Sequence, residues 1–180
     1  MLSQKSESRL QNMKSEGHQK AFLAIRCLLK LEQYSDIDLI YDAFGKPFLA
    51  NKLHISISHS HHFATIAISN QKIGIDIELQ REKIIKIADK FSQEVLKPSD
   101  KSIYIRKLTQ IWCAKEALFK IKNQAGISFK NHIFVKNLKV NATKNTSELH
   151  FNNQIEYFQN YLYLIEDFIL VATFEKSFIK

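Results

Sequence analysis

The chain has 180 residues, of which 45% are hydrophobic and 24% are charged, so it can bury a core and global disorder is excluded. Four glycines and two prolines exclude collagen-like and low-complexity classes. The longest run without Lys, Arg, Asp or Glu, residues 53–71, holds four histidines and four serines, so we expect no membrane span. The N-terminus lacks the apolar region of a secretory signal, and we expect a cytoplasmic protein with reduced Cys27 and Cys113.

The formal net charge of +8 is unevenly distributed along the chain. Residues 81–144 carry fifteen Lys or Arg and five Asp or Glu, a net +10, whereas residues 1–80 carry +1 and residues 145–180 carry −3. A basic middle segment indicates an acidic partner, which could be a nucleic acid, a phosphorylated cofactor or an acidic protein. The alternative is a lysine-rich surface that only faces solvent.

In the first half, residues 1–16 are polar with little pattern, and we expect them to fray. Apolar spacing predicts a helix over 18–32, and a short strand follows at 37–41. Gly and Pro then predict a turn over 44–47. Three strands are predicted next, the first two able to pair across a His-Ser-His-His bend: 53–58, 63–69 and 73–79.

In the second half, apolar spacing predicts a helix over 83–91 and a long helix over 101–123 that begins after Pro98-Ser99-Asp100. Three β-like runs close the chain: 132–140, 157–165 and 168–174. Helix, strands, helices and strands in this order predict an α+β fold rather than alternating βαβ units. The length and the absence of a linker predict one domain, 1–180, with approximate halves 1–80 and 81–180.

Asp76 and Glu78 are two positions apart on a predicted strand, so their carboxylates share one face. Carboxylates this close repel unless a cation or proton lies between them, and oxygen ligands suit Mg²⁺. Gly74 on the same face would let a bulky ligand approach the backbone. The alternative is a solvated edge strand whose polar face is acidic.

The long helix places Trp112, Glu116 and Lys120 along one face at i, i+4 and i+8. Glu116 and Lys120 could form a surface ion pair that stabilises the helix by a few tenths of a kcal/mol. If Glu116 instead faces Asp76 and Glu78, it becomes a third carboxylate. Lys120 would then lie beside a metal-bound phosphate, where an ammonium stabilises developing charge.

The segment Ser56-Ile57-Ser58-His59-Ser60 offers hydroxyls and an imidazole at a strand end, where they could bind phosphate oxygens. The neighbouring histidines lack the spacing of zinc sites. No nucleophile elbow, P-loop or Rossmann glycine pattern is present in the sequence.

Four blocks in this order resemble the 4′-phosphopantetheinyl transferases of the longer single-chain type, which activates surfactin and other carrier-protein synthases. They are Phe44-Gly45-Lys46-Pro47, Ile55 to Ser60, Gly74-Ile75-Asp76-Ile77-Glu78 and the W-x-x-K-E-A-x-x-K block from Trp112 to Lys120. The G-x-D-x-E block alone is weak evidence, whereas the ordered set is specific. The resemblance covers about residues 20–174.

The resemblance implies transfer of 4′-phosphopantetheine from coenzyme A to a serine of an apo acyl or peptidyl carrier protein. The reaction would use Mg²⁺ and release adenosine 3′,5′-bisphosphate. The implied fold is α+β with two similar halves related by a pseudo-twofold axis, for which a monomer suffices.

The resemblance also implies roles for individual residues. Asp76, Glu78 and Glu116 match the metal ligands, Glu116 the catalytic base and Lys120 a catalytic group that assists the leaving phosphate. The residues that match coenzyme A contacts are Arg26, Lys46, Ser58, His59, Asp76 and Lys120. The N-terminal region is short and polar compared with that of many relatives, so the resemblance leaves part of the nucleotide pocket unassigned.

Two alternatives stay open. One is a catalytically weak family member that binds coenzyme A or a carrier protein. The other is a basic nucleic-acid-binding protein, against which the sequence shows no interleaved aromatics and no helix-turn-helix or zinc signature. We therefore expect neither a nucleic acid nor a membrane as a partner.

Overall fold

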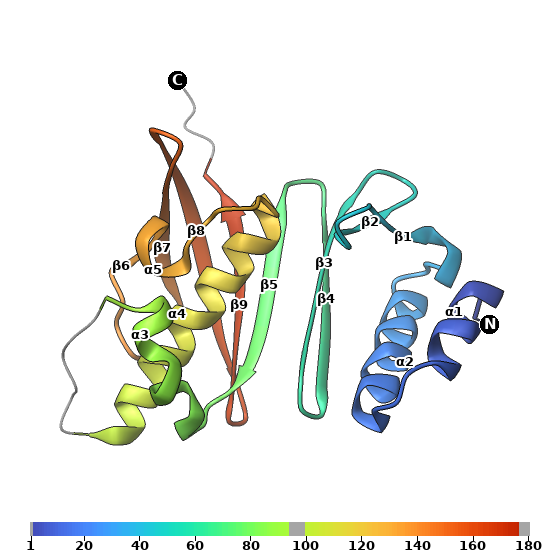
Figure 1. Cartoon of the computed structure of the whole chain (residues 1–180), viewed down its shortest axis with the longest axis horizontal. Coiled ribbons are helices and arrows are strands. Elements are labelled where there is room, and N and C mark those ends of the chain that lie inside the picture. The colour runs from blue at the N-terminus through green and yellow to red at the C-terminus, as the bar shows by residue number, and fades with distance from the viewer. Residues whose placement is uncertain (1, 94–99, 177–180) are drawn as a thin grey trace.

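The computed structural model describes residues 2–93 and 100–176 (Figure 1). Helices and strands are segregated along the chain, and every strand pair in the described residues is antiparallel, which confirms the α+β expectation. The α-helices are α1 (Gln4–Gln11), α2 (Glu16–Leu31), α3 (Ala88–Phe91), α4 (Lys101–Lys122) and α5 (Phe129–His132). Two 3₁₀ helices span Asp36–Asp38 and Glu82–Ile87.

The strands form three sheets. The first two sheets are hairpins, made of β1 (Leu39–Tyr41) with β2 (Pro47–Leu49) and of β3 (His54–Ser60) with β4 (Phe63–Ser69). The third sheet has the order β5-β9-β8-β7-β6, and its strands are β5 (Ile73–Leu79), β6 (Ile133–Lys136), β7 (Lys144–Phe151), β8 (Gln154–Ile165) and β9 (Phe168–Glu175). Strand β5 is therefore an edge strand, paired with β9 on one side.

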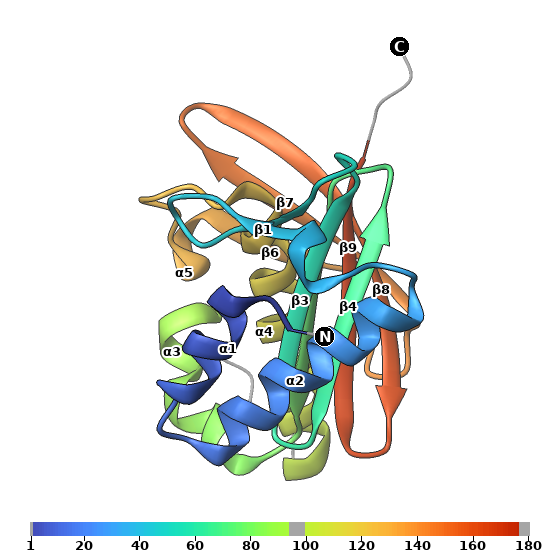
Figure 2. The ribbon, with the colours of Figure 1, turned by 90° about the vertical axis from the view of Figure 1, so that its right-hand side faces the viewer.

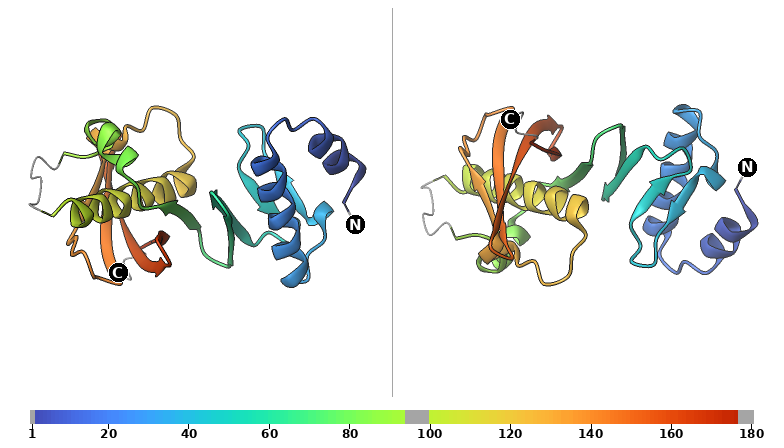
Figure 3. Two further views of the ribbon diagram at one scale, coloured as in Figure 1. Left: turned by 90° about the horizontal axis from the view of Figure 1, so that it is seen from below. Right: turned by 90° about the horizontal axis from the view of Figure 1, so that it is seen from above.

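The molecule has two lobes with β5 and the β3–β4 hairpin between them (Figure 3). In one lobe α4 packs across β5 and β9 of the five-stranded sheet, and in the other α2 covers the β3–β4 hairpin (Figure 2). The lobes have separate apolar cores. Leu29 and Ile55 lie in the core under α2, and Leu118 and Phe158 lie in a core under α4.

Several predicted elements are confirmed. The predicted strands 63–69 and 73–79 match β4 and β5, and the first pairs with β3 as expected. Helix α4 begins after Asp100, whose carboxylate accepts hydrogen bonds from the backbone N–H groups of Ser102 and Ile103. Pro98 and Ser99 of the predicted start signal lie outside the described residues.

Other expectations are wrong or incomplete. Residues 82–91 begin as a 3₁₀ helix and only the last four are α-helical. The predicted strand at 132–140 is only Ile133–Lys136 in β6, and β2, β7 and α5 were not predicted. Strand β7 escaped prediction because its inward positions include the polar residues Asn145 and Ser147, which hide the period-2 pattern.

The N-terminal segment folds where fraying was expected. Ser3 caps α1, and the carboxylate of Asp36 accepts hydrogen bonds from Ser3 N (2.8 Å), Ser3 Oγ (2.5 Å) and Ser6 Oγ (3.0 Å). These partners are about thirty residues apart in sequence, so local pattern could not indicate that α1 is anchored.

Candidate active site

Strand β5 and helix α4 approach so closely that one glycine is required between them. A Cβ on Gly74 would lie 1.8 Å from the Ala117 carbonyl oxygen and 2.8 Å from its carbon. Gly74 therefore allows the α4 backbone, rather than a ligand, to approach β5, which corrects the sequence-based interpretation. The same approach brings the Asp76 and Glu78 face of β5 against α4.

Asp76 is buried, with 5% of its surface exposed, so the solvated-strand alternative is wrong. Its Oδ1 accepts hydrogen bonds from Lys120 Nζ and from Ser58 Oγ, each at 2.8 Å. Its Oδ2 is buried and has no hydrogen-bond partner among the described residues. A buried carboxylate oxygen in this state attracts a cation or a proton donor.

Lys120 does not form the surface ion pair considered from the sequence. Its Nζ bonds to Asp76 Oδ1 and to the Ile75 carbonyl oxygen, 2.8 Å in each case, which joins α4 to β5. Glu116 lies near enough to interact electrostatically with Asp76, Glu78 and Lys120. The structure thus brings the two predicted catalytic residues to the acidic face of β5.

Burial raises the pKa of two of these carboxyl groups. The pKa of Glu116 rises to about 7, first because burial disfavours the carboxylate and then because Asp76 is negative. The pKa of Glu78 is also raised by burial, although Ser60 Oγ donates a hydrogen bond to its Oε2 at 2.8 Å. Both groups would be stabilised in their ionised form by a bound cation.

Among residues 2–93 and 100–176, no three His, Cys, Asp or Glu side chains converge closely enough to form a ready metal site. The predicted set of Asp76, Glu78 and Glu116 nevertheless supplies the hard oxygen donors that Mg²⁺ prefers. Asp76 Oδ2 is a fully buried oxygen of this set that has no hydrogen-bond partner within the described part of the chain. The residues present therefore fit a divalent cation.

Serine side chains connect β3 to β5 in place of a backbone ladder. Ser56 Oγ accepts from Ile75 N at 2.9 Å, and Ser58 Oγ accepts from Ile77 N at 3.2 Å. Ser58 Oγ also donates to Asp76. Alternate residues of β3 are serines, and they face the side of β5 on which Asp76 and Glu78 alternate. Their hydroxyls hold the backbone and carboxylates of β5 in position.

Beside these carboxylates lies a cleft of about 320 Å³ between the β1–β2 turn, β3 and the end of α4. Lys46, His59 and Lys120 line it, together with the aromatic rings of Tyr41 and Phe44. Lys46 Nζ donates to the Ile121 carbonyl oxygen at 2.7 Å, and burial lowers its pKa. Three of the predicted coenzyme A contacts therefore share one cleft.

The other three predicted contacts, Asp76, Arg26 and Ser58, are already engaged inside the protein, Asp76 with Lys120 and Ser58 as described above. Arg26 Nε bonds to Asp36 at 3.0 Å, and its guanidinium lies 3.5 Å from the centre of the Phe22 ring. Ser58 is buried and its hydroxyl bonds to β5. Their contacts with coenzyme A stay predictions.

Lys115 is a structural residue that sequence analysis did not identify. Its Nζ donates to the carbonyl oxygens of Phe91 (2.6 Å), Phe129 (2.5 Å) and Ile133 (2.5 Å), and burial lowers its pKa to about 8. One ammonium thereby ties α3, α5 and β6 to the residue next to Glu116. Lys115 is the first lysine of the W-x-x-K-E-A-x-x-K block, but its spacing did not indicate that its ammonium is buried.

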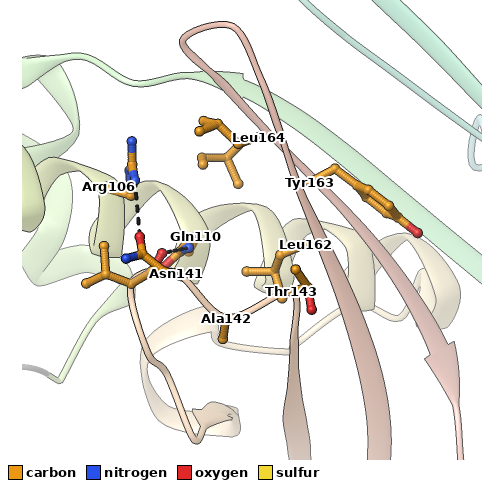
Figure 4. A pocket seen from close by; sticks show the side chains of 10 residues that line it. Arg106, Gln110, Asn141, Ala142, Thr143, Leu162, Tyr163 and Leu164 are labelled. Atoms are coloured by element: carbon orange, nitrogen blue, oxygen red, sulfur yellow. Dashed lines mark hydrogen bonds between the residues drawn. The ribbon is translucent and has the colours of Figure 1, made fainter.

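A separate cavity of about 250 Å³ lies under the first half of α4 (Figure 4). Arg106 and Gln110 face Asn141 across it, and Gln110 Nε2 donates to the Val140 carbonyl oxygen at 2.9 Å. None of the predicted site residues lines this cavity. We therefore assign the candidate active site to the β3–β5–α4 junction.

The sequence profile of the 4′-phosphopantetheinyl transferase superfamily matches residues 72–172, which include β5, α4 and most of the five-stranded sheet. This match spans more than half of the chain. The chain belongs to the 4′-phosphopantetheinyl transferase superfamily. The recognition from four sequence blocks is confirmed.

Two curated transferases of this superfamily are similar to the chain. It is 37% identical over 81 residues to 4′-phosphopantetheinyl transferase Gsp of Aneurinibacillus migulanus. The aligned segment covers 43% of this chain and 34% of that protein. It is 32% identical over 92 residues to 4′-phosphopantetheinyl transferase Sfp of Bacillus subtilis strain 168, covering 48% and 41%. The matches thus span only about a third to two-fifths of the length of these relatives.

In the described ranges 2–93 and 100–176, no helix is both long and apolar enough to cross a membrane.

Proposed function

We propose that the chain transfers the 4′-phosphopantetheine group of coenzyme A to a serine of an apo acyl or peptidyl carrier protein. The observation that carries this proposal is the junction of Asp76, Glu116 and Lys120 beside the cleft lined by Lys46 and His59. Superfamily membership and the names of the two relatives support the same reaction class. Adenosine 3′,5′-bisphosphate would be released.

Each group at the junction has a chemical task in this reaction. The acceptor serine oxygen forms a bond to the β-phosphorus of coenzyme A while the bond from that phosphorus to the bridging oxygen breaks. Glu116 accepts the serine proton as the general base; with no cation bound, burial raises its pKa to about 7. The Lys120 ammonium stabilises the negative charge left on the departing nucleotide.

Lys46 and His59 hold the phosphates in the cleft by charge and hydrogen bonding. Asp76, Glu78 and Glu116 are the residues that would hold Mg²⁺. When bound, the ion would neutralise the pyrophosphate charge at the reacting phosphorus. The unpartnered Oδ2 of Asp76 supports this assignment.

The test is intact-mass spectrometry of a panel of apo carrier proteins incubated with the enzyme, coenzyme A and Mg²⁺. We expect a gain of one phosphopantetheine group on at least one carrier, and no gain with Glu116→Gln or when a chelator replaces Mg²⁺. Lys90→Met, at an exposed position of α3, is the matched control and should keep full activity. A panel that stays unmodified with the wild type while coenzyme A still binds would favour the weak, carrier-binding alternative.

A further inference from the structure

The cavity under the first half of α4 has no role in the reaction described above (Figure 4). Its volume is about 250 Å³. An apolar cavity of about 150 Å³ is large enough to hold benzene, so this one has room for a somewhat larger molecule. Its polar side chains include Arg106, Gln110 and Asn141, and its apolar side chains include Leu162 and Ile169.

The side-chain amide of Gln110 is only half satisfied. Gln110 has 3% of its surface exposed, and its Nε2 donates to the Val140 carbonyl oxygen at 2.9 Å. Its Oε1 is buried and has no hydrogen-bond partner among the described residues. Exchanging the two amide atoms would not repair this, because the oxygen would then face the Val140 carbonyl oxygen. Because Gln110 lines the cavity, a ligand with an N–H or O–H group can supply the missing donor.

Arg106 lies one helical turn before Gln110 and supplies a cation. Its guanidinium bonds only weakly to two neutral oxygens, Gln80 Oε1 at 3.2 Å and Asn141 Oδ1 at 3.4 Å. It belongs to none of the ion pairs formed within residues 2–93 and 100–176. No Asp or Glu from these ranges lines the cavity. The positive charge is therefore available to an anion, with N–H groups arranged to bind it.

The rest of the lining limits the kind of anion. Leu162 and Ile169 are buried, whereas Leu164, beside Arg106 in Figure 4, is 55% exposed. An apolar group in the cavity would cover part of Leu164 and remove apolar surface from water. A single cation among apolar walls suits a carboxylate better than a phosphate, which carries more charge and requires more donors.

We propose that this cavity binds a small amphipathic carboxylic acid that carries an N–H or O–H group near its carboxylate, as acylated amino acids and hydroxy acids do. The carboxylate pairs with Arg106, the N–H or O–H donates to Gln110 Oε1, and the apolar part packs on Leu162 and Leu164. Residues at i and i+4 of a helix have Cβ atoms about 6 Å apart, so the two polar groups of the ligand are a few bonds apart. The ligand would bind whether or not the chain modifies carrier proteins, because no predicted site residue lines this cavity.

The test uses N-acetyl-L-leucine, which combines a carboxylate, an amide N–H and an isobutyl group. Its binding to the ¹⁵N-labelled full chain is followed by NMR titration. We expect saturable shifts at the residues that line the cavity, including the side-chain amide of Gln110. N-acetyl-L-leucinamide lacks the carboxylate, and N-acetyl-N-methyl-L-leucine lacks the N–H. Each should bind about tenfold more weakly, because each loses one of the two polar contacts.

Two variants assign these contacts to residues. Arg106→Met should weaken binding of N-acetyl-L-leucine about tenfold and leave binding of the uncharged leucinamide unchanged. Gln110→Met should abolish the preference for the N–H compound over its N-methyl analogue. Lys139→Met removes an exposed positive charge from the loop between β6 and β7 and is the matched control, with no expected effect. Thermal melting establishes that each variant is folded.

Three results would overturn the site. The first is the absence of saturable shifts at about 20 mM N-acetyl-L-leucine, since a molecule of this size should bind in the millimolar range. The second is equal affinity of the wild type for all three compounds. The third is an equal effect of Arg106→Met and Lys139→Met, which would reduce the attraction to non-specific charge. The comparison of the three compounds uses the wild type alone, so it decides the matter even if a variant does not fold.

Discussion

Strand β5 is contacted from two directions in physically different ways. On one side α4 lies directly on its backbone at Gly74, and Lys120 joins the two elements through the Asp76 carboxylate. On the other side β3 reaches β5 through serine hydroxyls such as Ser56 Oγ. The first contact depends on the absence of a side chain, and the second depends on side chains replacing a backbone ladder.

The difference separates rigid positioning from adjustable positioning. A backbone-to-backbone contact cannot be relaxed without moving α4, which carries Glu116 and Lys120. A hydroxyl bridge has a rotatable side chain and accepts a small shift between the lobes. The cleft lined by Lys46 and His59 lies between the two sides, because β3 and the end of α4, through Lys120, both line it.

The largest expected effect is a loss of stability when the backbone contact between β5 and α4 is disturbed. Gly74→Ala should prevent folding or lower the free energy of unfolding by about 3 kcal/mol, since its Cβ meets the Ala117 carbonyl group. Urea denaturation measures the loss. Gly17→Ala is the matched control, because its Cβ would lie 3.7 Å from the nearest heavy atom and should not destabilise α2. Equal stability of Gly74→Ala and wild type would refute the close approach.

The second expected effect concerns the carboxyl group of Glu116, which is half-buried where α4 packs on β5. The folded pKa of Glu116 is about 7, above its ordinary value of 4.5, so stability should fall as pH rises from about 4.5 to 7. Glu116→Gln removes this ionisation. We therefore compare the free energy of unfolding of this variant with that of the wild type, with a chelator present. The difference in favour of the variant should grow by roughly 2 kcal/mol from about pH 4 to about pH 8, allowing for partial exposure of the side chain.

Chemical denaturation at the two pH values measures this gain, and Glu7→Gln at an exposed position of α1 serves as the control. The same Glu116→Gln variant should have lost transfer activity. Stability that rises while activity disappears indicates a carboxylate kept for chemistry rather than for folding. A gain that is equal at both pH values would show that Glu116 is not perturbed.

The smallest expected effect on stability comes from removing a serine contact between β3 and β5. Ser56→Ala leaves the buried Ile75 N–H without its acceptor and should cost about 1 kcal/mol of unfolding free energy. Ser69→Ala removes a hydroxyl that accepts from Gln71 N in an exposed turn and should cost less. If Ser56→Ala and Ser69→Ala lower the free energy of unfolding equally, the serine hydroxyls of β3 do not hold the two lobes together.

The lysines of the basic segment, residues 81–144, are divided between positions bonded inside the protein and exposed positions. Lys115 and Lys120 are bonded inside the protein, and Lys122 pairs with Glu156 at 2.7 Å. Other lysines of the segment, such as Lys83 and Lys90, are exposed. The net charge of the segment therefore overstates the positive surface that a partner would meet.

The sequence by itself determined the elements with strong periodicity and the chemistry of the family. The alternation around Asp76 and Glu78 predicted β5, and the helix that carries Glu116 and Lys120 was predicted within one residue at its C-terminal end. Four ordered blocks were enough to identify the superfamily. The periodic elements are local in sequence, so local spacing is sufficient evidence for them, whereas the superfamily was identified by resemblance.

Only the tertiary structure decided which partner each polar group takes. Sequence spacing paired Lys120 with Glu116, whereas the fold pairs it with Asp76 from a strand 44 residues away. The fold likewise places Gly74 against helix α4 and pairs Arg26 with Asp36. A hydrogen bond or ion pair depends on distance in space, and a one-dimensional pattern does not contain that distance.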